Sequence, residues 1–239
     1  MIRNLLLSGG PLHDFDATSS AIATLLATGD GGPIETTIVD DPTDAFAQLC
    51  AGSTPGTPVW NLLTVNALHW RMEADRYTHL RERDAFELSG ADGEMISAFV
   101  HDGGGLLAVH TAVICFDAEP HWRALIGAPW NWERSSHPPV GEVCVQVSAV
   151  GRRHPITAGI EPFCIVDELY GFLDDADDIE PLLTATLDGT VHPLLWAGAA
   201  GAGRVVTDLL GHGVESIAHP VHRTILQRAA AWTLEAWHE

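Results

Sequence analysis

GGGLLAVHTA, residues 103–112, is the stretch of sequence that decides the fold class. Its glycines precede a short apolar run at 106–109, which predicts a buried central strand that ends abruptly at His110. Because a phosphate-binding loop follows a strand and does not precede it, we interpret the glycines as a helix stop and a tight entry to the sheet. In open α/β sheets, functional side chains lie just beyond the carboxyl ends of strands. His110 occupies such a position and is the first candidate site residue.

Strands and helices alternate on the N-terminal side of this stretch. Alternation of this kind predicts parallel strands joined by crossover helices. We expect strands at 3–8, 34–39 and 58–65, and helices at 16–28, 43–50 and 89–101. The polar and aromatic residues at 66–86 are interpreted as an excursion over the carboxyl edge of the sheet, where they could wall a pocket.

The C-terminal half continues the same pattern and predicts an extension of the first sheet. A short helix follows Pro120, a final helix begins near Pro220 and ends near Trp237, and residues 192–213 suggest a hairpin-like pair of strands. Further strands are expected at 143–150, 162–168, 191–196 and 204–209. Because the chain has no repeat, low-complexity tract or clean linker, we expect one domain over residues 1–239.

The charge balance limits the partners that this chain can have. Twelve Lys and Arg against thirty-two Asp and Glu give a formal net charge of -20. Such a chain repels phosphate backbones and anionic membranes, whereas the charge has no effect on a neutral sugar.

The apolar run at the N-terminus is too short for a signal peptide or a membrane span, so a cytoplasmic location is expected.

The four cysteines show neither paired CxxC motifs nor the density of a secreted disulfide scaffold. We therefore expect all four to be reduced and buried. They are Cys50, Cys115, Cys144 and Cys164.

Three other strand ends carry candidate site residues. The segment 154–172 places Asp167, Glu168 and Tyr170 after an apolar strand, where an acid and a phenol can orient a histidine or hold sugar hydroxyls. His212 lies between two glycines, and His13 follows the first strand. Structural alternatives remain open: a hydrogen-bonded core histidine for His110, a turn cap for the acid and a surface histidine for His212.

Tryptophans and additional histidines complete the candidate set. Sugar rings commonly stack on aromatic side chains, although core packing is the commoner use of a tryptophan. We expect Trp130, Trp132 and Trp196 near a pocket. The chain has no HExxH pattern, and imidazoles that could serve a divalent metal include His137, His192, His219 and His222. If a metal is bound, the expected ligands are His110, Glu168 and His212.

The ordered set GGGLLAVHTA, HPIT, DELY, HPLLW, GRVV and GHG resembles the ThuA-like trehalose-utilisation family over nearly the whole chain. The resemblance implies a flavodoxin-like, doubly wound, mostly parallel sheet with helices on both faces, as in class I glutamine amidotransferases. It also implies a role in the metabolism of trehalose and related, often oxidised, disaccharides. His110 falls at the elbow where an amidotransferase has its cysteine, with Glu168 and His212 as partners. Because an imidazole cannot form the thioester, amidotransferase activity is not expected.

The chain also departs from the usual pattern of this family. It has Gly-Ala-Gly-Arg at 201–204 where many members have Gly-Lys-Gly-Arg, and the Trp commonly found after GHG is replaced around Ser216 and Ile217. Substrate contacts are therefore expected to differ from those of other members.

These features predict an enzyme that acts on a disaccharide or keto-sugar glycoside by isomerisation or by bond cleavage. His110 and His212 would exchange protons with the substrate while Glu168 orients an imidazole. The expected substrate-binding residues are His13, Trp132, His137, Tyr170, His192 and Trp196. The alternatives are a non-catalytic sugar-binding or regulatory domain, a metal-dependent hydrolase and a subunit of a larger complex. No organic cofactor is expected, a divalent metal is left open, and a homo-oligomer is compatible with the sequence.

Overall fold

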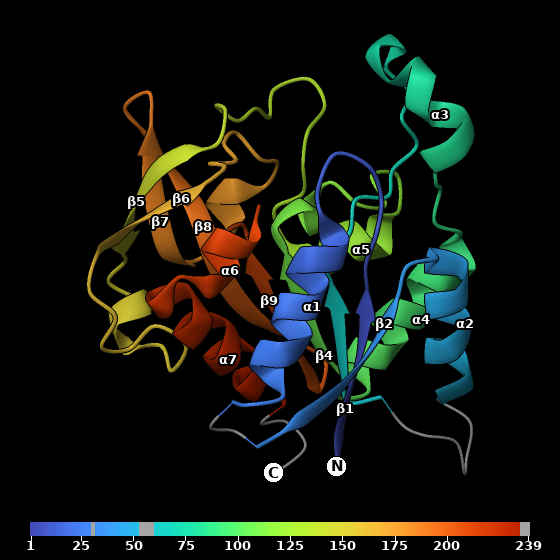
Figure 1. The fold of residues 1–239 in the computed structure, drawn as a ribbon, viewed down its shortest axis with the longest axis horizontal. Helices are drawn as coiled ribbons and strands as arrows, with labels where there is room; N and C mark the ends of the chain where they lie inside the picture. The colour runs from blue at the N-terminus through green and yellow to red at the C-terminus, as the bar shows by residue number, and fades with distance from the viewer. Residues whose placement is uncertain (30–31, 53–59, 235–239) are drawn as a thin grey trace.

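A computed structural model of the chain describes residues 1–29, 32–52 and 60–234. Its strands are β1 (Ile2–Leu7), β2 (Ile34–Val39), β3 (Leu62–Val65), β4 (Gly105–Val109), β5 (Gly141–Val147), β6 (Phe163–Asp167), β7 (Pro181–Leu187), β8 (Thr190–Ala200) and β9 (Gly203–Asp208). Its helices are α1 (Phe15–Leu26), α2 (Pro42–Gly52), α3 (Thr78–Asp84), α4 (Gly90–His101), α5 (Pro120–Ile126), α6 (Val214–Ala218) and α7 (Pro220–Leu234). The described strands form one sheet in the order β2-β1-β3-β4-β9-β8-β7-β5-β6 (Figure 1).

The sheet has a parallel part and an antiparallel part. Strands β2, β1, β3, β4 and β9 pair in parallel, which confirms the expected arrangement for this part. From β9 onward the pairs are antiparallel, so the expectation of a mostly parallel sheet does not extend to β8, β7, β5 and β6. Because β7 and β6 each run antiparallel to an antiparallel neighbour, they point in the same direction as β9.

Helices pack in two groups against the sheet. Helices α1, α6 and α7 contact one another in front of the sheet in Figure 1, and α2, α4 and α5 form the second group. Strands β3 and β4 are buried at every residue, as expected for parallel strands covered on both faces. The helices thus seal the apolar sheet and leave its carboxyl edge for the loops.

A buried polar network fixes the start of α1 against β3. The Asn66 side chain donates hydrogen bonds to the hydroxyls of Thr18 and Ser19, both at 2.9 Å, and the hydroxyls of Ser19 and Ser8 lie 2.8 Å apart. Asp14 caps the helix by accepting a hydrogen bond from the backbone of Ala17 at 3.1 Å. The loop between β1 and α1, which carries His13, is therefore anchored at both ends.

The structure corrects several element boundaries. The strand expected at 58–65 is observed at 62–65, and residues 58–59 lie outside the described part. The last helix is observed over 220–234, and the predicted end at 235–237 also lies outside it. Helices α3 and α6 and strand β7 were not predicted from the sequence. Register shifts within β7 interrupt its alternation, which explains why it gave a weak strand signal.

The expectation for the cysteines is confirmed only for Cys115, which is buried and unpaired. Cys50 is exposed, and Cys144 and Cys164 form a disulfide across exposed positions of β5 and β6. These two residues are direct partners in the antiparallel register, a proximity that a separation of 20 residues does not reveal. Disulfides are rare in reducing compartments, so the cytoplasmic location remains a prediction.

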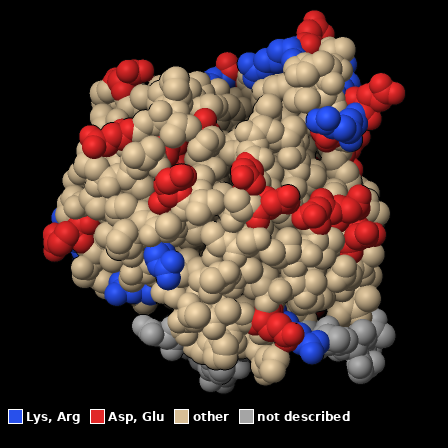
Figure 2. Space-filling view, in the orientation of Figure 1, with Lys and Arg blue, Asp and Glu red and all other residues tan. Residues whose placement is uncertain are grey.

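No helix in the described part of the chain combines the length and apolar character that a membrane span requires. Acidic side chains are spread widely over the face shown in Figure 2, in keeping with the net charge of -20.

The pairing of cysteines can be tested by counting thiols. Protein unfolded in denaturant without reductant is expected to react at two thiols per chain, those of Cys50 and Cys115. Reduction before unfolding should raise the number to four because it releases Cys144 and Cys164. Four reactive thiols without reductant would contradict the disulfide.

Candidate functional site

Four loops bring candidate residues to the same edge of the sheet. His13 follows β1, His110 follows β4, Glu168 follows β6 and His212 comes shortly after β9. Because these strands point in one direction, their carboxyl ends meet at one edge. Each of the four residues offers one nitrogen or oxygen atom, and these atoms all lie within 4.8 Å of one another. The convergence expected from the sequence is therefore observed.

His110 occupies a sharp turn at the end of β4. Its φ is 50°, in the left-handed region that costs a non-glycine residue about 1 kcal/mol or more. Its Nδ1 lies 2.8 Å from the carbonyl oxygen of Leu209, and its Nε2 lies 3.2 Å from the hydroxyl of Tyr170. Since a carbonyl only accepts, Nδ1 carries the hydrogen and Nε2 is turned toward Glu168 and Tyr170. His110 is 1% exposed, so it lies beneath the site surface.

Glu168 is the centre of the site. Its Oε2 lies 3.2 Å from His212 Nδ1, 3.5 Å from His110 Nε2 and 3.8 Å from His13 Nε2. Its other oxygen, Oε1, lies 3.3 Å from Nδ1 of His137. One carboxylate is thus surrounded by four imidazoles, and His137 joins the site as the sequence analysis expected.

The surroundings favour the ionised form of Glu168. Burial by itself would raise the pKa of this carboxyl, but the neighbouring imidazoles of His110, His13 and His137 outweigh burial and hold the pKa well below its usual value. Burial also lowers the pKa of His13 and raises that of the Tyr170 hydroxyl. The site therefore combines a carboxylate with a phenol that keeps its proton.

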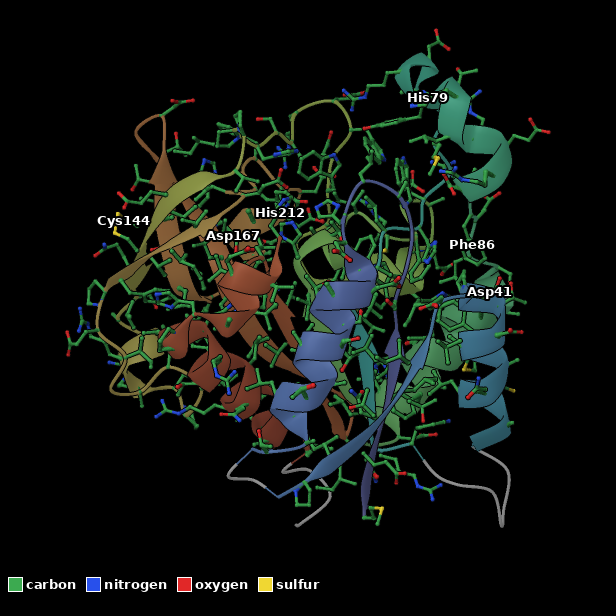
Figure 3. All side chains as sticks on the ribbon, in the orientation of Figure 1. Asp41, His79, Phe86, Cys144, Asp167 and His212 are labelled. Atoms are coloured by element: carbon green, nitrogen blue, oxygen red, sulfur yellow. A yellow bond between two sulfur atoms is a disulfide. The ribbon has the colours of Figure 1, made fainter. Side chains whose placement is uncertain are left out.

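Asp167, next to Glu168, holds the turn that carries His212. The backbone N–H groups of Gly211 and His212 donate to its carboxylate at 2.8 and 3.2 Å, and the hydroxyl of Ser216 donates to the same group. Figure 3 shows Asp167 and His212 close together near the centre of the molecule, far from Cys144 at the edge. Asp167 thus positions the backbone that carries His212.

A second buried acid, Asp208, supports the same turn. Its carboxylate accepts a hydrogen bond from the backbone of Leu210 at 3.0 Å and lies 3.1 Å from Nε2 of His222. The other ring nitrogen of His222 lies 2.9 Å from the carbonyl of Ser216. Burial opposes a charged imidazole, but Asp208 outweighs burial and raises the pKa of His222 above its usual value. His222 is therefore part of a structural ion pair.

A cavity of about 450 Å³ opens above Glu168. Glu168, Tyr170 and three of the histidines, but not His110, form its base, and aromatic side chains form much of its wall. Trp70 and Trp132 stack with ring centroids 5.9 Å apart, and Tyr77 contacts both rings. The lining residues of most interest are His13, Trp70, Tyr77, Trp132, His137 and His212. A concave site with aromatic walls and a few convergent polar groups is typical of small-molecule binding.

Two of the expected substrate-binding residues do not reach this cavity. His192 lines a different hollow, where its Nδ1 accepts a hydrogen bond from the backbone of Phe172 at 3.3 Å. Trp196 is buried, and its Nε1 donates to the carbonyl of Ile126 at 2.8 Å. Both lie toward the start of β8, near its pairing with the carboxyl end of β9, so they are near the site edge of the sheet but their side chains contact other groups.

Several residues that build the site were not predicted from the sequence. Trp70 and Tyr77 belong to the excursion at 66–86, whose expected role as a pocket wall is confirmed, but no feature distinguished them individually. Ser135 and Ser136 also line the cavity. Asp208 and His222 support the turn at His212. Asp208 could have been recognised from the sequence as a site residue, because it is a charged residue within the apolar run at the end of β9.

A family model described as trehalose utilisation, ThuA, matches residues 81–233, which is more than half of the chain. The chain belongs to the ThuA family. The matched residues include His110, Glu168 and His212, whereas His13 lies before them. No curated protein matches the chain in sequence.

Solved structures share the fold of this ThuA family member. A putative ThuA-like protein from Parabacteroides merdae is 17% identical, with a TM-score of 0.73 over 98% of this chain and 90% of that one. One from Bacteroides uniformis is also 17% identical, with a TM-score of 0.67 over 97% and 91%. A β-galactosidase from Rahnella is 12% identical, with a TM-score of 0.55 over 97% of this chain but only 31% of that one. At these identities the likeness concerns the fold alone.

The pair formed by His222 and Asp208 predicts a pH-dependent contribution to stability. Because the folded-state pKa of His222 is raised, the pair stabilises fully below the unfolded-state pKa of about 6.5, and the contribution is lost as the pH rises through the folded-state value. The difference in unfolding free energy between the wild type and His222→Gln should therefore shrink as the pH is raised above about 6.5. Urea denaturation at several pH values measures this difference, and a difference that does not change with pH would contradict the ion pair.

Proposed function

We propose that this chain is an enzyme of carbohydrate metabolism that acts on a disaccharide or a keto-sugar glycoside, by isomerisation or by cleavage of a bond near a carbonyl. One observation carries the proposal: the Glu168 carboxylate lies among imidazoles at the base of an aromatic-walled cavity. The description of the family as trehalose utilisation supports a sugar as the substrate class. A histidine at the elbow after β4 argues against the cysteine chemistry of glutamine amidotransferases.

The cavity suits a neutral sugar. Its volume of about 450 Å³ lies within the range of small-molecule sites. The aromatic wall offers rings against which the apolar face of a sugar can stack, while Ser135, Ser136 and Glu168 can hydrogen-bond its hydroxyls. A neutral substrate also avoids repulsion by a chain with a net charge of -20.

The base of the cavity offers the groups that acid–base catalysis requires. Isomerisation, or cleavage next to a carbonyl, needs one group to remove a proton from carbon or oxygen and another to donate one. We assign proton exchange to His212, which lines the cavity and lies 3.2 Å from Glu168 Oε2. Glu168 orients this imidazole toward the cavity base. His137, 3.3 Å from Oε1, can hold a substrate hydroxyl on the opposite side.

His110 takes a different role from the one expected of it. His110 is 1% exposed and does not line the cavity. The cavity is lined instead by its neighbours Glu168, Tyr170 and His212. We therefore propose that His110 acts as a positioning residue, which fixes Glu168 and Tyr170 and does not exchange protons with the substrate itself.

We also propose that the parallel part of the sheet is flavodoxin-like. Its order, β2-β1-β3-β4-β9, follows the order 2-1-3-4-5 of that fold. The likeness supports a site at the carboxyl edge, where ligands bind in open α/β sheets.

The proposed function can be tested with 3-keto-trehalose as substrate and mass spectrometry to follow products. Glu168→Gln keeps the shape of the side chain but removes its charge, and His212→Ala removes the proposed proton carrier. Each change is expected to lower kcat about 100-fold or more. His110→Ala should lower kcat while leaving KM nearly unchanged, because His110 does not line the cavity.

His101→Ala is the matched control, since His101 ends α4 at the opposite edge of the sheet and should leave turnover at the wild-type level. Wild-type turnover in both Glu168→Gln and His212→Ala would overturn the proposal. Thermal stabilisation of the wild type by the sugar without any product would favour a non-catalytic sugar-binding domain.

A further inference from the structure

We propose that the Glu168 carboxylate and three of its neighbouring imidazoles bind one divalent transition metal ion of the zinc class. The ligands are His13, His110, Glu168 and His212. This inference deepens the proposed function, because the metal would lie at the base of the same cavity. It adds His13 to the ligands expected from the sequence.

The distances around Glu168 fit tetrahedral coordination. With metal–ligand bonds of 2.0 to 2.2 Å, two ligand atoms of a tetrahedral zinc site lie about 3.3 to 3.6 Å apart. Glu168 Oε2 lies 3.2, 3.5 and 3.8 Å from the nearest nitrogens of His212, His110 and His13. All four ligand atoms lie within 4.8 Å of one another, so side-chain adjustments of less than about 1 Å would complete the site.

Several of the proposed ligand atoms are buried and have no hydrogen-bond partner. Among the described residues, these atoms include Glu168 Oε2, His212 Nδ1 and both ring nitrogens of His13. Buried polar atoms are normally satisfied, and the exceptions require an explanation such as an ion. That three such residues from separate loops point at one place is the observation that favours a metal over an ordinary polar cluster.

The hydrogen bonding of His110 prepares it as a ligand. Its Nδ1–H donates to the carbonyl of Leu209 at 2.8 Å, which leaves the lone pair of Nε2 directed at Glu168. Metal-binding histidines commonly donate their other N–H to a carbonyl or carboxylate in this way. The same Nε2 lies 3.2 Å from the Tyr170 hydroxyl and 3.5 Å from Glu168 Oε2, so its lone pair is close enough to the carboxylate for both groups to bind one cation.

The turn that carries His212 is also fixed in advance. Asp167 accepts hydrogen bonds from the backbone of Gly211 and His212, and Ser216 donates to it as well. A rigid supporting network of this kind lowers the cost of ordering ligands upon metal binding.

The donor set selects the class of metal. Three imidazoles and one carboxylate suit zinc and related ions such as cobalt, whereas magnesium and calcium prefer oxygen ligands. The acidic chain, at a net charge of -20, also attracts cations. A metal at this position could polarise a carbonyl or hydroxyl oxygen of a sugar in the cavity. With the metal bound, His212 would be a ligand and would no longer exchange protons, and His137, which lies beside Oε1 and not Oε2, would take over proton transfer.

The test uses metal alone, with no sugar, so that the metal site and the proposed function can fail separately. Protein stripped with a chelator is titrated with Zn²⁺ by calorimetry and with Co²⁺ by visible absorption, which reports coordination geometry. We expect one ion per chain and an intense tetrahedral cobalt spectrum. His212→Ala, His13→Ala and Glu168→Gln should each weaken zinc binding about 100-fold or more.

Two controls separate this site from adventitious binding to surface histidines. His101→Ala removes an exposed histidine, and His137→Ala removes an imidazole beside Glu168 that is not a proposed ligand; both should bind zinc as the wild type does. Circular dichroism checks that each variant is folded, and His212→Ala is the most informative because its side chain is partly exposed. Absence of stoichiometric binding, or binding unchanged in His212→Ala and Glu168→Gln, would overturn the proposal and would leave an imidazole–carboxylate cluster in its place.

Discussion

The interaction on which the rest of the structure depends is the contact between one buried carboxylate, Glu168, and the imidazoles around it. Removing a carboxylate or an imidazole from water costs solvation free energy. This cost is offset when the two groups form an ion pair, share a hydrogen bond or bind the same ion. The contact requires loops from β1, β4, β6 and β9 to end at one edge. These four strands point in the same direction, so the loops that follow them meet at one edge of the sheet. This holds for β6 although it belongs to the antiparallel part.

The supporting residues explain how such an arrangement is held. His110 adopts a left-handed backbone conformation that a packed core must stabilise, and its ring is fixed by the Leu209 carbonyl. Asp167 accepts a hydrogen bond from the backbone of His212, and Asp208, paired with His222, accepts one from the backbone of Leu210. Acids therefore serve two purposes here: Glu168 faces the cavity, whereas Asp167 and Asp208 organise the backbone that presents its neighbours.

The sequence predicted the parts of this molecule that follow from local pattern. Apolar runs that end in turn residues located β1, β4 and β9, and the strand-end rule placed His13, His110, Glu168 and His212 at one edge. It could not predict features set by long-range register. The Cys144–Cys164 pairing and the contacts that keep His192 and Trp196 out of the cavity depend on which segments become neighbours. The register shifts in β7 hid that strand for the same reason.

The central claim is that the imidazoles around Glu168 form the ligand-responsive centre of the molecule. The most direct measurement is the NMR spectrum of protein labelled with ¹⁵N in its histidine rings, recorded with and without 3-keto-trehalose and assigned by single substitutions. The account predicts that the ring signals of His137 and His212 shift when the sugar is added, while those of His79 and His101 stay in place. Shifts confined to His192, or no shift at any histidine with the sugar in excess, would contradict it.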